Sequence, residues 1–358
     1  MSNIANSSFS DGQLFHKVEK LMREDQTRVR LGFDKAAAFL NGLFCHLSSI
    51  DPVSLEDCRC DKVTLNEFNL MCTLKHLPYD QMSLEGDAKI GVVKVKLAES
   101  YSDSYDKACW EDVCTQYRGS RDRYLDTNKI RLALYRAVKT ILNCENEDGA
   151  SIICETKSGF ITLIVNLHLN GIYRFNLLPA MWVSRKWSTL KKFDERVSHV
   201  FDTLDVKDSI ECIQIVARPT ATLSHTLWRI TFNDLENRIL NLKKFFCVQH
   251  CIFTLHSLQK KYLVSKNLPS LSLYNIRLIT LREILKNPKP QEWSAEKFSL
   301  RLDSLLKSAR AALEEKSNNN VFTYVNILGN CHKKDLKFLS GEFSRMRRFY
   351  KEMVLLLP

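Results

Sequence analysis

Glu67 and Asn69 lie two residues apart in a β-rich segment, and this spacing has a chemical meaning. On a strand, residues two apart point to the same face of the sheet. Carboxylates in such positions, joined by a third from a neighbouring strand, can hold two Mg²⁺ or Mn²⁺ ions for phosphoryl transfer. Asn176 occupies the matching position of another predicted strand, so the pattern has one acid and two amides. An amide does not offset divalent charge, and a Glu-x-Asn pair by itself is more typical of an ordinary strand.

Several segments have the composition of strands that would carry these side chains. Residues 67–74 form an apolar run that ends before Pro78, and residues 90–97 alternate in part. Three further runs predict an antiparallel meander over residues 151–155, 160–169 and 172–178. Asn170-Gly171 predicts a two-residue type I′ turn between the last two strands, since both residues tolerate positive φ.

Helical periodicity dominates the two ends of the chain. Residues 12–47 predict a long amphipathic helix with a basic outer face, after a loose tail over residues 1–11. Residues 127–143 predict a second helix, with Asp126 or Thr127 as its N-cap. From about Thr226 the chain is predicted to be helical almost to its end. The amphipathic stretches there are 234–264, 271–286, 294–315 and 335–356.

The composition limits the function classes. The 358 residues include 52 Lys and Arg against 41 Asp and Glu, a net charge of +11 that favours nucleic acid or an anionic membrane as partner, although a basic protein need bind neither. Glycine and proline are scarce, at 11 and 8, which favours helices over many short strands. No apolar run is long enough to span a membrane, and the first residues do not resemble a secretory signal. The 12 scattered cysteines are therefore expected to be reduced, in the cytoplasm or the nucleus.

Four segments resemble cyclic GMP-AMP synthase and its relatives in the Mab (male-abnormal) family, in the same order and over roughly residues 10–355. The segment that resembles the family's catalytic strand is LNEFNLMCTLKHLP (65–78), and the one that resembles its hairpin with the third acid is SGFITLIVNLHLNGIYRFNLLPAMW (158–182). The segment that resembles its Trp-Arg helix entry is LWRITFNDLENRIL (227–240), and the one that resembles its conserved Tyr helix is LSLYNIRLITLREILKNPKPQEW (271–293).

This resemblance implies an α/β (α+β) fold: a nucleotidyltransferase-like lobe with a mixed central sheet and a long N-terminal spine helix, plus a helical C-terminal lobe. The expected parts are the tail 1–11, the spine helix and nucleotidyltransferase-like lobe 12–225, and the helical lobe 226–358. The family's metal acids fall on Glu67, Asn69 and Asn176, so only Glu67 would ligate Mg²⁺ or Mn²⁺. The family's Gly-Ser phosphate motif should precede Glu67, but residues 51–58 read DPVSLEDC.

The resemblance also implies ligands. Arg229, Glu236 and Tyr274 match the family's nucleotide-contacting positions, which implies ATP or GTP. Without the resemblance, Tyr274 is more typical of a packing residue, and Glu236 is explained by a surface pair with Lys243 or Arg238. The family lysine beside the nucleotide aligns with Phe253. The zinc insertion of cyclic GMP-AMP synthase has no counterpart here, and Cys247, His250 and Cys251 would give three ligands where structural zinc takes four. No zinc is expected.

Basic residues crowd several segments and predict contacts to phosphate, with solvated helix faces as the alternative. Without the zinc insertion, the chain is more similar to family members that bind double-stranded RNA than to those that bind DNA. The residues expected to contact nucleic acid are Lys17, Lys20, Arg23, Arg28, Arg185, Lys186, Lys191 and Lys192. Further basic groups span residues 118–139 and 333–351. No membrane partner is expected, and the sequence does not indicate an oligomeric state.

Three hypotheses follow. The first is a nucleic-acid or nucleotide-binding protein of innate immune signalling that has lost metal-dependent catalysis. The second is an active receptor that makes a cyclic dinucleotide from ATP and GTP on binding double-stranded RNA, with Glu56 or Asp57 supplying the missing acids. The third is a developmental or partner-binding protein with no role in nucleic-acid binding.

Overall fold

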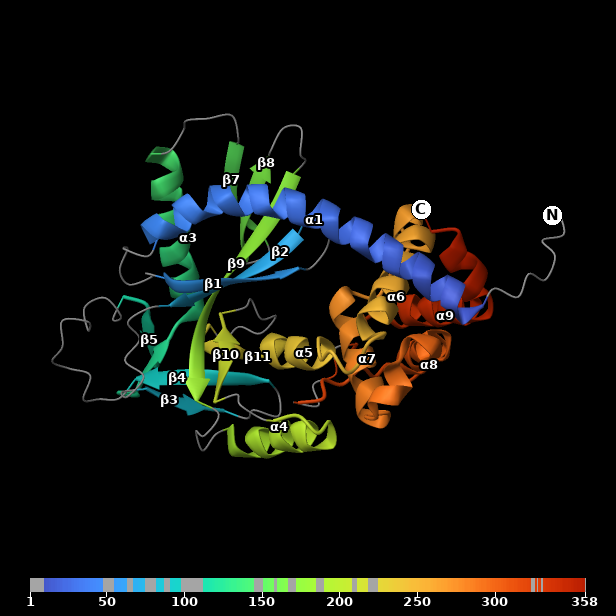
Figure 1. Cartoon of the computed structure of the whole chain (residues 1–358). Helices are drawn as coiled ribbons and strands as arrows, with labels where there is room; N and C mark the ends of the chain where they lie inside the picture. The colour runs from blue at the N-terminus through green and yellow to red at the C-terminus, as the bar shows by residue number, and fades with distance from the viewer. Residues whose placement is uncertain are drawn as a thin grey trace. The chain divides into compact units, whose positions relative to one another are not determined.

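A computed structural model of the chain describes residues 10–47, 55–62, 67–74, 82–86, 91–97, 112–144, 151–157, 160–166, 172–184, 190–207, 211–217, 225–322, 326, 328–329 and 331–357 (Figure 1). The chain divides into two compact units. The sheet unit comprises residues 28–195 and 209–232, and the helical unit comprises residues 1–27, 196–208 and 233–358. The predicted tail at residues 1–11 falls almost entirely outside the described residues, and the first helix begins at Asp11.

One mixed sheet forms the centre of the sheet unit. Its main path runs β1-β2-β9-β10-β11-β4-β6-β5, while β3 pairs with β4 and β7 pairs with β8, which in turn pairs with β9. The pair β2 and β9 is parallel, and the other described pairs are antiparallel, which confirms the predicted mixed sheet. The strands are β1 (Leu55–Lys62), β2 (Glu67–Leu74), β3 (Met82–Glu85), β4 (Val92–Leu97), β5 (Cys114–Gln116), β6 (Arg123–Leu125), β7 (Ser151–Lys157), β8 (Phe160–Asn166), β9 (Ile172–Ser184), β10 (Cys212–Val216) and β11 (Leu227–Thr231).

The predicted strand at residues 67–74 matches β2, and the predicted meander matches β7, β8 and β9. The core of this region forms where Phe68 and Phe175 are direct partners in the parallel register and stack with ring centroids 5.2 Å apart. Such a pair contributes about 0.5–1.5 kcal/mol beyond its burial. The stack fixes the register of β2 against β9, and therefore the positions of the polar side chains on either side of it.

The two-residue turn predicted at Asn170-Gly171 lies outside the described residues. The last described partners of β8 and β9 are Asn166 and Ile172. The last described partners of β7 and β8 are Lys157 and Phe160.

The helix predicted over residues 127–143 is α3 (Thr127–Cys144), which packs beside β7 and β9 (Figure 1). Asp126 is its N-cap: Oδ1 accepts hydrogen bonds from the backbone N–H groups of Asn128 and Lys129, at 2.9 and 3.1 Å. Thr115 Oγ1 donates to Asp126 Oδ2 at 2.6 Å, which ties the helix start to β5. Of the two cap candidates, the acidic residue satisfies the first free N–H groups of the helix.

The helical unit buries Trp293, Phe298 and Phe343 completely. The predicted amphipathic stretches correspond to its helices, with a break between α5 and α6 where one stretch was predicted. The helices outside α3 are α1 (Asp11–Leu47), α4 (Lys191–Thr203), α5 (Asn233–Leu240), α6 (Val248–Tyr262), α7 (Leu273–Lys286), α8 (Phe298–Glu314) and α9 (Lys333–Leu355). Within the part of the chain that the structure describes, none of the helices has the length and apolar character that crossing a membrane requires.

The prediction of helix from Thr226 is wrong for residues 227–231, which form β11. Trp228 and Ile230 are buried on one face of this strand, which pairs with both β10 and β4. The sheet therefore continues past the predicted boundary at 225/226, and α5 starts only at Asn233.

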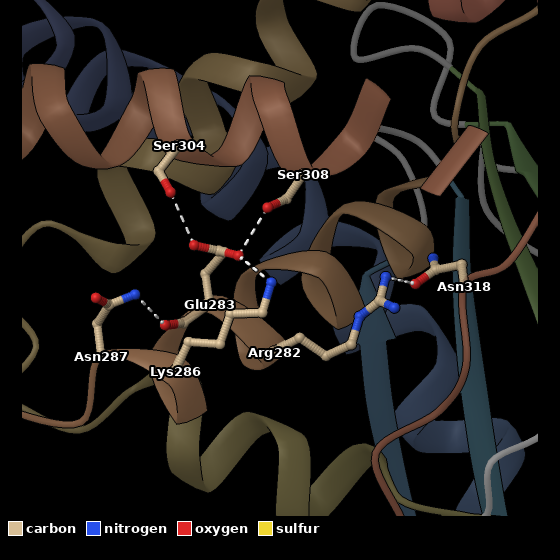
Figure 2. Close-up of polar contacts among 7 residues, drawn as sticks. All are labelled: Arg282, Glu283, Lys286, Asn287, Ser304, Ser308 and Asn318. Atoms are coloured by element: carbon tan, nitrogen blue, oxygen red, sulfur yellow. Dashed lines mark hydrogen bonds and ion pairs between the residues drawn. The ribbon is translucent and has the colours of Figure 1, made fainter. Parts of the chain in front are cut away.

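A buried carboxylate joins α7 to α8 (Figure 2). Glu283, 3% exposed, accepts hydrogen bonds from Ser304 Oγ at 2.8 Å and Ser308 Oγ at 2.7 Å, and Lys286 Nζ lies 2.9 Å from its Oε1. Burial raises the pKa of Glu283, but the hydrogen bonds from Ser308, Lys286 and Ser304 outweigh it and hold the pKa below its usual value. On the same helix, Arg282 donates to Asn318 Oδ1 at 2.5 Å (Figure 2). These contacts fix α7 in the unit.

Candidate functional site

The sheet brings Glu67, Asn69 and Asn176 together. Asn69 and Asn176 are direct partners in the parallel pair of β2 and β9, and Glu67 lies two residues before Asn69 on the same face. Asn176 Nδ2 donates to Glu67 Oε1 at 3.0 Å and to Asn69 Oδ1 at 3.2 Å. All three side chains are half-buried. The amide nitrogen of Asn176 is thus the centre of the cluster, with an oxygen on either side.

Thr162 completes this cluster, although the sequence did not single it out. It is the partner of Asn176 across the antiparallel pair of β8 and β9, and its Oγ1 donates to Asn176 Oδ1 at 2.9 Å. The hydroxyl therefore orients the Asn176 amide with its N–H groups toward Glu67 and Asn69. The signal that could have identified Thr162 is the register of β8 against β9, which the sequence alone does not determine.

Arg229 lies on the same face of the sheet as Asn176. Ala180, four residues after Asn176 on β9, is the partner of Val216, and Val216 is the partner of Arg229. Directly opposed residues share a face of the sheet. The side chains of Met71, Leu178, Ala180 and Val216 form a buried apolar cluster on this face. One face of the sheet therefore carries the polar side chains of Glu67, Asn69 and Asn176, followed by this apolar cluster. Arg229 lies on the same face, beside Val216 of the cluster.

Glu236 and Tyr274 form a second cluster, within the helical unit. Glu236, on α5, is fully buried, and its Oε1 accepts a hydrogen bond from Tyr274 Oη at 3.3 Å. Asn320 Nδ2 donates to the same Oε1 and to Tyr274 Oη, both at 3.1 Å. A fully buried carboxylate does not reach a ligand in solvent, so Glu236 positions Tyr274, whose side chain is half-buried. Neither the type nor the spacing of Asn320 indicates from the sequence that it belongs to this cluster.

The basic residues predicted to bind nucleic acid are only partly described. Lys20 and Arg23, on α1, are exposed and form i,i+4 ion pairs with Glu24 and Glu19, with N···O distances of 4.0 and 2.7 Å. Exposed pairs of this kind contribute little to stability, so a phosphate can displace the acidic partner. Lys17 is half-buried and Lys191 is exposed. The side chains of Arg28 and Lys192, and the whole of Arg185 and Lys186, lie outside the described residues.

Residues 63–242 match a family model described as the Mab-21 protein nucleotidyltransferase domain. This is just over half of the chain. The chain belongs to the Mab-21 family. The matched region contains Glu67, Asn69, Asn176, Arg229 and Glu236, and it ends before α7, which carries Tyr274. A search of curated proteins found no match.

The donor set of Glu67, Asn69 and Asn176 does not fit two divalent cations. Hard cations such as Mg²⁺ prefer several oxygen ligands, with carboxylates to offset their charge. Here Glu67 is the one carboxylate, and Asn176 presents nitrogen-bound protons, not oxygen, toward Glu67 and Asn69. The neutral amide of Asn176 thus links Glu67 Oε1 and Asn69 Oδ1 by hydrogen bonds, in the position where a cation would have to bind both oxygens. Among the described residues, no group of three or more His, Cys, Asp or Glu side chains is arranged to hold a metal ion.

Proposed function

We propose that this Mab-21-family chain binds double-stranded RNA, a nucleotide, or both, in innate immune signalling in the cytoplasm or nucleus, and that it has lost metal-dependent catalysis. The observation that carries the proposal is the donation from Asn176 Nδ2 to Glu67 Oε1 and Asn69 Oδ1. A cluster whose polar groups bond one another has little need of a cation. Restoring a two-cation site would require new carboxylates and the loss of these hydrogen bonds.

Nucleotide binding is supported by the second cluster. The ring of Tyr274 is held by two hydrogen bonds at its hydroxyl, from Asn320 and to Glu236, which limits its rotation. An aromatic ring fixed in this way is a suitable surface for stacking a base. In the sheet unit, considered by itself, Arg229 supplies a cation on the face that carries Glu67, and an arginine pairs well with phosphate.

Double-stranded RNA binding is supported by the net charge of +11 and by the exposed cations of α1 and α4. Their contacts would go to phosphates and would therefore be sensitive to salt and insensitive to base sequence. A protein that reads the A-form backbone binds duplex RNA better than duplex DNA of the same length.

The binding experiment is a titration of the full chain with labelled duplex RNA and matched duplex DNA at several salt concentrations. We expect RNA affinity to fall steeply with salt, and Lys17→Glu with Lys20→Glu to lower it by about tenfold. Lys260→Glu with Lys266→Glu is the matched control, because it reverses two cations of the helical unit that are not on α1. Equal binding by both double variants would contradict the assignment to α1, and absence of salt-sensitive RNA binding would contradict the RNA proposal.

A further inference from the structure

Helix α9 has one buried face and one exposed face of unusual composition. Leu336, Leu339, Phe343 and Met346 are buried, and α9 lies beside α8, where Arg347 pairs with Asp303 (Figure 1). The opposite side, which we name the α9 outer face, is built at spacings of three and four residues, so its members as far as Arg348 lie on one side of the helix. α9 is kinked at Phe349, where the backbone departs from helical geometry. Its exposed cations and aromatic residues are Lys334, Lys337, Phe338, Arg345, Arg348 and Phe349.

The cations of the α9 outer face are available for an external partner. Within the part of the chain that the structure describes, Lys334, Lys337, Arg345 and Arg348 have no acidic partner within 4.0 Å, whereas Arg347 and Lys351, on the sides of the helix, pair with Asp303 and Asp11. Glu342, four residues after Phe338, and Glu352, four residues after Arg348, are acidic, and two carboxylates against four cations leave the balance positive. Charge complementarity therefore favours an extended anionic partner.

Large apolar side chains interrupt these cations. Phe338 and Phe349 are 38% and 46% exposed, and Leu356, directly after α9, is 66% exposed. Phosphate and sugar contacts to duplex RNA need no such side chains, and leucine cannot stack on a base in the way an aromatic ring does. At a lipid surface, phenylalanine and leucine enter the boundary between headgroups and acyl chains, while lysine and arginine contact anionic headgroups.

We propose that the α9 outer face docks on a membrane that contains anionic phospholipid, with α9 lying parallel to the membrane surface. This departs from the expectation of no membrane partner. The inference does not depend on the proposed function, because it uses no residue of the two clusters described above. The buried face of α9 stays packed in the helical unit while the outer face binds the membrane.

The experiment is co-sedimentation of the full chain with vesicles of phosphatidylcholine alone or of phosphatidylcholine with phosphatidylserine. We expect binding only to the anionic vesicles, and a decrease in affinity of at least about tenfold for Lys337→Glu with Arg345→Glu. Lys243→Glu with Lys289→Glu reverses the same charge at exposed positions outside α9 and should bind like the unaltered chain.

A second pair of variants separates lipid from nucleic acid. Phe338→Ala with Phe349→Ala should weaken vesicle binding several-fold and leave duplex RNA binding unchanged, while Ile153→Ala with Ile172→Ala, two exposed residues of the sheet, should affect neither. All variants should keep the thermal midpoint of the unaltered chain. Equal binding to neutral and anionic vesicles, no vesicle binding, or a loss of RNA binding alone on charge reversal would overturn the proposal.

Discussion

Asn176 Nδ2 lies 3.0 Å from Glu67 Oε1, across the parallel pair of β2 and β9. Both residues belong to the predicted metal site, in which Glu67 is the one carboxylate beside Asn69 and Asn176. The hydroxyl of Thr162 fixes the direction of the amide by donating to its oxygen. The amide of Asn176 therefore joins β2 and β9 at this point through its hydrogen bonds to Glu67 and Asn69.

Asn176→Asp should destabilise the protein at neutral pH. The substitution removes two donated hydrogen bonds and places a second carboxylate beside Glu67, so we expect the free energy of unfolding to fall by about 2 kcal/mol. Because like charges raise the folded-state pKa of one carboxyl, the penalty should grow as the pH rises above about 4. Mn²⁺ should restore part of the stability by binding the folded state. Denaturant titrations with and without Mn²⁺ measure both effects.

Asn69→Asp is the matched control for that substitution. It introduces the same charge on β2, but Asn176 Nδ2 can still donate to the new carboxylate, as it now donates to Asn69 Oδ1. The loss of stability should therefore be smaller. Equal losses for the two variants would show that the amide of Asn176 does not join the cluster.

Tyr274 should contribute its hydroxyl to stability and its ring to nucleotide binding. Tyr274→Phe removes the bonds to Glu236 and Asn320 and should lower the free energy of unfolding by about 1–2 kcal/mol, with nucleotide affinity changed by less than about twofold. Tyr274→Ala should weaken ATP or GTP binding by about tenfold. Calorimetry measures the affinities. Tyr262→Ala, also on the helical unit, is the control, and unchanged affinity in Tyr274→Ala would remove the stacking role.

Glu283 should make the free energy of unfolding decrease as the pH falls into the acid range. Its folded-state pKa is below the usual value, so its contribution is fully present above the unfolded-state pKa of about 4.3 and is lost as the pH falls through the folded-state pKa. Glu283→Gln should lower the free energy of unfolding at pH 7 by about 1–3 kcal/mol and flatten its decrease in acid. Denaturation at a series of pH values tests this, with Glu315→Gln as the exposed control. An unchanged pH profile in Glu283→Gln would contradict the network.

Local patterns predicted the parts of the fold that local forces determine. The apolar run of β2, the three strands of the meander and the Asp126 cap depend on residues close in sequence, and the structure confirms them. Residues 227–231 were predicted incorrectly because their strand character comes from pairing with β10 and β4, which are distant in sequence.

The candidate site shows the same limit. Sequence identified Glu67, Asn69 and Asn176, but the direction of the Asn176 amide depends on Thr162, whose register neither spacing nor composition determines. Glu236 was predicted to contact a nucleotide, whereas the structure buries it completely and its Oε1 accepts a hydrogen bond from Tyr274.

The central claim is the loss of metal-dependent catalysis. The most direct test incubates the full chain with labelled ATP and GTP and Mg²⁺ or Mn²⁺, with and without duplex RNA or DNA, and separates the products. We expect no new product under any of these conditions, including in the presence of RNA that the chain binds. A cyclic or linear nucleotide product that requires the cation and disappears in Glu67→Ala would contradict the account.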